Sequence, residues 1–118
     1  MTRDELLDAC TALPGAVEDY PFGDGVAVFK VGGRMFALVP LDGAPVSINL
    51  KCEPELALAL RTSYAAVRPG YHMNKRHWNT VDVDGSVPDG ELREMIDHSY
   101  RLVVGGLPRR ERRLLSDT

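Results

Sequence analysis

Two short runs of β-branched and aromatic residues, joined by a pair of glycines, constrain the fold of this chain more than any other feature. The runs are Val26–Val31 and residues 34–39, and Gly32 and Gly33 lie between them. Glycine adopts positive φ at little cost, which two-residue hairpin turns require. The pattern therefore predicts an antiparallel hairpin. A further strand is predicted at residues 46–50, where apolar and polar side chains alternate.

Helical patterns lie on both sides of these strands. Residues 3–13 follow a capping-box pattern, in which Thr2 and Glu5 are three positions apart. A second helix is expected to begin at Pro54, because proline is tolerated in the first helical turn. Asp89 is expected to cap a third helix.

The remaining segments complete a sheet. Residues 78–83 are predicted to form a strand, whereas residues 17–22 fit either a short edge strand or a loop, since Pro21 disfavours a central strand. The order helix, strands, helix, strand, helix predicts a two-layer α+β domain, an antiparallel sheet with helices packed on one face. The other face of such a sheet is then partly open to water.

The length of 118 residues indicates one domain, residues 1–106, followed by a basic tail at residues 107–118. We expect this tail to be solvated, with a basic arm or one more helical turn as alternatives. No apolar run reaches the roughly 20 residues of a membrane helix, and the N-terminus has no secretory signal. We therefore expect a cytoplasmic monomer with no membrane partner.

The residues that could bind a metal or catalyse a reaction form weak patterns. His72 and His77 are five positions apart, so only a turn could bring both to one ion. Cys10 and Cys52 are typical of small packed thiols, although Cys52 follows Lys51 at an expected helix start, which favours a thiolate. No serine elbow, phosphate-binding loop or dinucleotide motif is present. We expect no enzymatic activity, no metal and no cofactor.

Charge is unevenly distributed along the chain, which has a net charge of −3. Between residues 26 and 81 there are seven Lys and Arg against three Asp and Glu, while the rest carries seven against fourteen. A basic middle segment gives an anion a place to dock, despite the negative total.

The richest stretch is residues 69–80, which reads Pro-Gly-Tyr-His-Met-Asn-Lys-Arg-His-Trp-Asn-Thr and contains the only Trp. Aromatic faces beside cations suit a phosphate-bearing or planar partner. The same residues also suit a scaffold, with Trp78 in the core and with Asn74 and Asn79 bonding turn amides.

Several motifs occur in the order typical of the MmcQ/YjbR family, which the chain resembles over about residues 6–104. These motifs are Leu13-Pro-Gly, Tyr20-Pro-Phe-Gly23, Val28-Phe-Lys-Val-Gly-Gly-Arg-Met-Phe-Ala37, Asn49-Leu-Lys-Cys-Glu-Pro-Glu55, the whole of residues 69–80, and Ile96-Asp-His-Ser-Tyr100. The resemblance implies a compact domain with a frataxin-like (CyaY-like) arrangement. It also implies DNA binding through a double-wing-like surface.

Together these patterns favour a low-specificity DNA-binding protein that contacts phosphates through a basic, aromatic-containing surface. Tyr71 or Trp78 would stack on a base, and the turn flanked by Lys30 and Arg34 would act as a wing. The expected contact residues are Lys30, Arg34, Lys51, Arg68, Tyr71, His72, Asn74, Lys75, Arg76, His77 and Trp78. The alternative is a non-enzymatic binding module for a small anionic ligand or a protein partner, with the same turn as a pocket wall.

Overall fold

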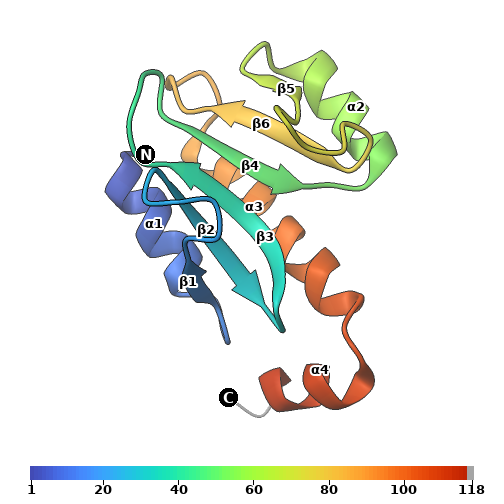
Figure 1. The fold of residues 1–118 in the computed structure, drawn as a ribbon. Helices are drawn as coiled ribbons and strands as arrows, with labels where there is room; N and C mark the ends of the chain where they lie inside the picture. The colour runs from blue at the N-terminus through green and yellow to red at the C-terminus, as the bar shows by residue number, and fades with distance from the viewer. Residues whose placement is uncertain (117–118) are drawn as a thin grey trace.

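The computed structural model describes residues 1–116, which form a six-stranded antiparallel sheet and four helices (Figure 1). The helices are α1 (Arg3–Thr11), α2 (Pro54–Ser63), α3 (Asp89–Gly105) and α4 (Arg109–Ser116). The strands are β1 (Val17–Asp19), β2 (Val26–Val31), β3 (Arg34–Pro40), β4 (Ser47–Lys51), β5 (Val67–Pro69) and β6 (Trp78–Asp82). The order across the sheet is β1-β2-β3-β4-β6-β5. None of the helices within these 116 residues is long and apolar enough to cross a bilayer.

The helices and the sheet form two layers. Leu6 of α1 and Ile96 of α3 pack in the main core against Phe29, Val39 and Ile48 of three strands. Figure 1 shows α3 passing behind the sheet. The opposite face carries a separate, smaller apolar cluster that contains no helical residue among those described. The predicted α+β architecture with an antiparallel sheet is therefore confirmed.

The β2–β3 hairpin forms at the two glycines, as predicted. Gly32 has φ 58° and Gly33 has φ 78°, and Val31 pairs with Arg34 across the turn. Leu107 packs against this turn so closely that a Cβ on Gly32 would lie 2.6 Å from its side chain. Positive φ and close packing therefore both demand glycine at this position.

Two short strands form the edges of the sheet. Val17–Asp19 is β1, which resolves the ambiguity at residues 17–22 in favour of an edge strand. Val67–Pro69 is β5, a strand that the sequence patterns did not indicate. Pro69 is tolerated there because an edge strand does not need every backbone N–H for the ladder.

Ser99 of α3 bridges the sheet where β3 and β4 stop pairing. The β3–β4 ladder pairs Ala37 with Leu50 and Leu38 with Asn49. At the next position the Lys51 amide donates to Ser99 Oγ at 2.9 Å, and this hydroxyl donates to the Phe36 carbonyl at 2.5 Å. Ser99 is fully buried. A helix side chain therefore satisfies two strand backbone groups that would otherwise lack partners.

The segment after α3 folds back onto the body. Leu107 is buried, and Arg109–Ser116 forms α4, so the helical alternative for the tail describes this segment. Leu115 packs so closely beside Gly15 that a Cβ added there would clash with its side chain. Residues 117–118 of the predicted tail lie outside the described residues.

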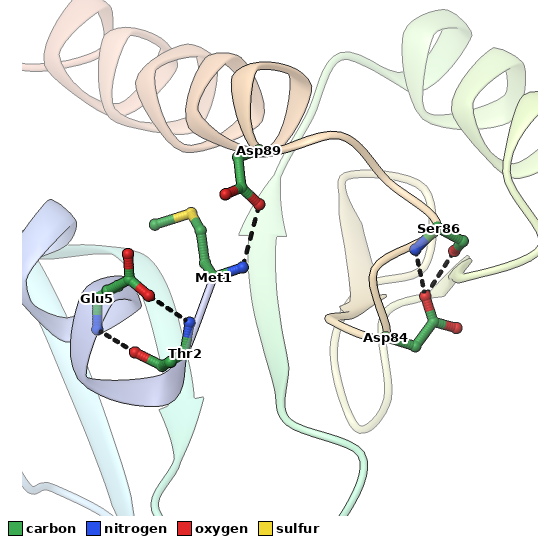
Figure 2. A network of polar contacts seen from close by, with 6 residues as sticks. All are labelled: Met1, Thr2, Glu5, Asp84, Ser86 and Asp89. Atoms are coloured by element: carbon green, nitrogen blue, oxygen red, sulfur yellow. Dashed lines mark hydrogen bonds and ion pairs between the residues drawn. The ribbon is translucent and has the colours of Figure 1, made fainter.

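Polar contacts connect the starts of α1 and α3 (Figure 2). Glu5 N donates to Thr2 Oγ1 at 3.1 Å and Thr2 N donates to Glu5 Oε1 at 3.0 Å, which confirms the capping box. The cap predicted at Asp89 is wrong, because the N-cap of α3 is Pro88, which makes no side-chain cap bond. Asp89 instead pairs with the amino group of Met1 at 3.0 Å.

Replacing Thr2 by alanine should lower the free energy of unfolding by about 1 kcal/mol, because it leaves the Glu5 amide without its cap. Urea unfolding followed by circular dichroism measures this change. Thr62→Ala is the matched control, since Thr62 is exposed within α2 and caps no helix. An equal loss in both variants would contradict a specific role for the cap.

Candidate functional site at one end of the sheet

Residues 70–77 form the β5–β6 loop, which contains most of the predicted contact residues. Gly70 N donates to the Trp78 carbonyl at 2.9 Å, and Tyr71 N donates to Thr80 Oγ1 at 3.0 Å. A Cβ on Gly70 would lie 2.8 Å from that of Trp78, so the loop approaches β6 as closely as glycine allows. These bonds fix the path of the loop against the strand.

Asn74 holds the centre of the loop together. Its side-chain Oδ1 accepts from the Arg76 amide at 3.0 Å, and its carbonyl accepts from the His77 amide at 3.1 Å. Asn74 therefore forms a turn, as the scaffold interpretation of this stretch predicted. Lys75 and Arg76 are exposed on the turn that Asn74 shapes.

Arg61 of α2 anchors the loop through hydrogen bonds to the loop and to β6. Its Nε donates to Asn79 Oδ1 at 2.7 Å, and its Nη2 donates to the carbonyls of Trp78, at 3.3 Å, and Lys75. Asn79 in turn donates to the Ala57 carbonyl at 3.4 Å. No local sequence pattern indicates this anchor, because the partners of Arg61 lie 14 to 18 positions away. Arg61 is therefore a positioning cation for the loop.

Trp78 belongs to the small apolar cluster on the helix-free face. It is 9% exposed and packs with Val28 and Leu38, with Met35 and Met73 at the edge of the cluster. Stacking on a base requires an accessible ring face. The burial of Trp78 therefore disfavours stacking on a base and agrees with the scaffold interpretation, in which Trp78 is a core residue.

Tyr71 is the exposed aromatic residue of the loop. It is 65% exposed, and its ring lies 4.0 Å from the His72 ring, centroid to centroid. His72 has φ 58°, a conformation that non-glycine residues rarely adopt and that often occurs at functional sites. An aromatic face is therefore accessible beside the loop cations.

Three of the predicted cations are engaged by groups from distant segments. Arg68 makes two hydrogen bonds to the Asp82 carboxylate, at 3.0 and 2.8 Å. Lys30 Nζ lies 2.9 Å from Asp19 Oδ2, and the hydrogen bond between them lowers the pKa of the Asp19 carboxyl. Arg34 donates to the Gly106 carbonyl at 2.7 Å, which fixes its position, and among residues 1–116 it makes no ion pair.

The strand register brings the predicted cations to one end of the sheet. Lys51 at the end of β4 pairs with Trp78 at the start of β6, and Arg34 begins β3 at the same end. We call this end, which carries Arg34, Lys51 and the β5–β6 loop, the basic end. Leu107 packs against the hairpin, and α4, which follows it, carries Arg109, Arg110, Arg112 and Arg113. Carboxylates lie here too: Glu53, Glu55 and Glu111 belong to the same segments, and Glu91 and Glu94 line a pocket together with Lys51.

Carboxylates predominate at the opposite end. There Val26 pairs with Pro40, and Ser47 pairs with Asp82. Arg3 places the start of α1 at this end, because it donates to the carbonyls of Pro40 and Gly43. The acidic residues of the adjoining turns and helix starts are Asp4, Glu5, Asp24, Asp42, Asp84 and Asp89. Acidic side chains of the turns and helix starts therefore gather at the end of the sheet opposite to Lys51 and Trp78.

Cys52 is buried beneath the basic end. Burial raises the pKa of its thiol to about 11, and the charge of Glu53 contributes in the same direction. The thiolate expected beside Lys51 is therefore disfavoured, since the low dielectric outweighs the helix start. Cys52 is a packed thiol with little nucleophilic character at neutral pH.

The histidines are divided between two parts of the molecule. His72 and His77 belong to the β5–β6 loop, whereas His98 lies on α3. Within residues 1–116, no group of three or more His, Cys, Asp or Glu is placed so that it could hold a metal ion.

The chain is similar to known proteins along almost its whole length. A model of the YjbR family matches residues 11–102. The uncharacterized protein YjbR of Escherichia coli K12 is 41% identical over 115 residues, which cover 98% of each chain. The crystal structure of Deinococcus radiodurans protein DR2400 matches with a TM-score of 0.91 and 41% identity, covering 98% of this chain and 88% of that one. A crystal structure from Pseudomonas syringae matches with a TM-score of 0.76 and 29% identity, covering 87% and 99%.

Proposed function

The chain belongs to the YjbR family, and we propose that it binds duplex DNA with low sequence specificity through the basic end of its sheet. The observation that carries the proposal is the register, which gathers Arg34, Lys51, Lys75 and Arg76 at one end of the molecule. A local cluster of cations attracts a polyanion even where the net charge is negative.

Three cations of this end are the candidates for phosphate contacts. Within the described residues, Lys51, Lys75 and Arg76 make no ion pair. The loop from residue 70 to 77 contains no Asp or Glu that would repel a phosphate. Lys75 and Arg76 are therefore the main phosphate contacts of the proposed site.

Tyr71 supplies the aromatic part of the proposed site in place of Trp78. Its exposed ring belongs to the loop that leads into β6, the strand in which Trp78 pairs with Lys51 of β4. Aromatic rings beside a phosphate track contact sugars and bases without reading sequence. Binding of this kind is tolerant of sequence.

The frataxin-like (CyaY-like) arrangement implied by the family resemblance is part of the same proposal. Helices on one face of the sheet leave the other face and its strand ends open. The β2–β3 hairpin and the β5–β6 loop project from the same end of the sheet, which supports a two-winged surface. Such a surface suits a duplex that lies across both loops.

The affinity for duplex DNA should fall steeply as the salt concentration rises. Four phosphate contacts give a slope of about −3.6 for log affinity against log salt, at about −0.9 for each contact. Lys75→Ala/Arg76→Ala should reduce the slope to about −1.8 and weaken binding on the order of tenfold. Fluorescence anisotropy of a labelled duplex, measured over a salt series, gives both quantities.

Arg93→Ala/Arg101→Ala is the matched control, because it removes the same charge from exposed positions on α3, in the helical layer. We expect this variant to bind as the parent does. Absence of binding at low salt, or an affinity that neither salt nor the loop substitutions alter, would eliminate the proposal. Equal weakening by both double variants would show that only net charge matters.

A small anion or a protein partner at the same loop remains the competing function. The positive φ of His72 is the observation that favours it, because such strain is often retained at ligand sites. Trp78 reports on this loop, since it is the only Trp and Met73 packs against its cluster. A change in Trp78 fluorescence with inorganic phosphate, but not with duplex DNA, would favour the anion.

A further inference from the structure

A pocket of about 120 Å³ lies between α2, α3 and the core side of the sheet. Its walls are mainly apolar, with Leu56 and Leu60 from α2, Met95 from α3, and Leu50 and Val81 from the sheet. It opens in the helical layer, away from the face that carries the Trp78 cluster. An apolar cavity of about 150 Å³ in another protein binds benzene, so this volume suits a ligand near the size of one aromatic ring.

His98, which also lines the pocket, contains an unsatisfied polar atom. Its Nε2 is buried, and within the described residues this nitrogen has no hydrogen-bond partner. Buried polar groups nearly always have partners, and an unpaired one costs about 1–3 kcal/mol. A bound molecule that offers one hydrogen-bonding atom would remove this penalty.

The other polar groups of the pocket restrict the charge of a ligand. Both ends of the Asn79 amide are already engaged, by Arg61 and by the Ala57 carbonyl. Glu91 and Lys51 line the pocket with opposite charges, and Glu94 is paired with Arg101 at 2.8 Å, so the lining offers no excess charge to a charged ligand. A charged ligand would also lose its hydration against apolar walls. The pocket therefore favours a neutral molecule.

We propose that this pocket binds a neutral, hydroxylated aromatic compound of one ring, with its hydroxyl group paired to Nε2 of His98. A hydroxyl fits either tautomer of the imidazole, because it both donates and accepts. The ring fills the space between Leu56, Leu60 and Met95. The pocket shares Lys51 with the proposed DNA surface, but the inference rests on His98 and the apolar walls and does not depend on DNA binding.

Phenol and benzene are the probes that test this proposal, because they differ by the one hydroxyl. In titrations of the full chain followed by two-dimensional amide NMR, phenol should shift resonances of α2 and α3 and bind about tenfold more tightly than benzene, the ratio expected for one hydrogen bond to a buried unpaired group. His98→Leu should bring the phenol affinity down to that of benzene.

Leu56→Trp should block both probes, because Leu56 lines the pocket, is 39% exposed and tolerates a larger side chain at the mouth. Leu58→Trp is the matched control, since Leu58 lies on the same helix, is 60% exposed and does not line the pocket. Equal affinities for phenol and benzene, an unchanged phenol affinity in His98→Leu, or equal effects of the two tryptophan variants would overturn the proposal.

Discussion

Replacing Phe36 by alanine is expected to lower the free energy of unfolding by about 3–5 kcal/mol. Phe36 is fully buried, and its ring lies 6.4 Å from that of Phe29 and 5.4 Å from that of Tyr100, the latter edge to face. Truncation removes both aromatic contacts and leaves a cavity between the sheet and α3. Few single changes in this chain should destabilise it more.

Guanidinium unfolding measured by circular dichroism gives the free energy of each Phe36 variant. Phe22→Ala is the matched control, because Phe22 is 64% exposed in the β1–β2 loop and should change stability by less than about 0.5 kcal/mol. The loss of unfolding free energy in Phe36→Leu should be smaller than that in Phe36→Ala and larger than that in Phe22→Ala. A loss below about 1 kcal/mol in Phe36→Ala would show that this part of the core is not packed as described.

Replacing Ser99 by alanine is expected to destabilise the fold by about 2–4 kcal/mol, although only one oxygen is removed. The change leaves the Lys51 amide and the Phe36 carbonyl without the partner they share. The groups lie where β3 and β4 have stopped pairing, so the strands cannot simply bond to each other. Desolvated backbone groups without partners account for the size of the effect.

Amide hydrogen exchange at Lys51 separates this cause from a general loss of packing. We expect faster exchange at Lys51 in Ser99→Ala than its lower global stability alone produces. Ser63→Ala is the matched control, since Ser63 is exposed at the end of α2. A Ser99→Ala variant as stable as Ser63→Ala would contradict the bridging role of the hydroxyl.

The elements that local chemistry determines could be predicted from the sequence. The hairpin follows from Gly32 and Gly33, which supply the positive φ values of its turn. The start of α1 follows from Thr2 and Glu5, whose reciprocal bonds need only three residues of separation. The Asp89 cap failed because the preceding Pro88 takes the cap position and the Asp89 carboxylate pairs with Met1 instead.

The candidate site could be predicted only in part, because its key partners are distant in sequence. The sequence predicts a turn rich in basic and aromatic residues ahead of a strand that begins at Trp78, and residues 70–77 form that loop between β5 and β6. The engagement of Lys30 by Asp19 and of Arg68 by Asp82 depends on strand pairing that no local pattern shows. The burial of Trp78 depends likewise on Val28 and Leu38 of other strands. The sequence shows which charged residues are present, whereas strand pairing determines which of them form ion pairs with one another.

Because charge differs between the two ends of the sheet, the charge that an approaching polyanion experiences depends on ionic strength. At physiological salt the Debye length is about 8 Å, whereas even the shortest dimension of the molecule is 26 Å. A polyanion at the basic end is then screened from the carboxylates of the far end and meets, in effect, a cationic protein. In very dilute buffer the Debye length grows to about 30 Å. A polyanion then interacts with the charges of the whole chain, whose net charge is −3. The molecule is then an oriented dipole that a polyanion attracts at one pole and repels at the other.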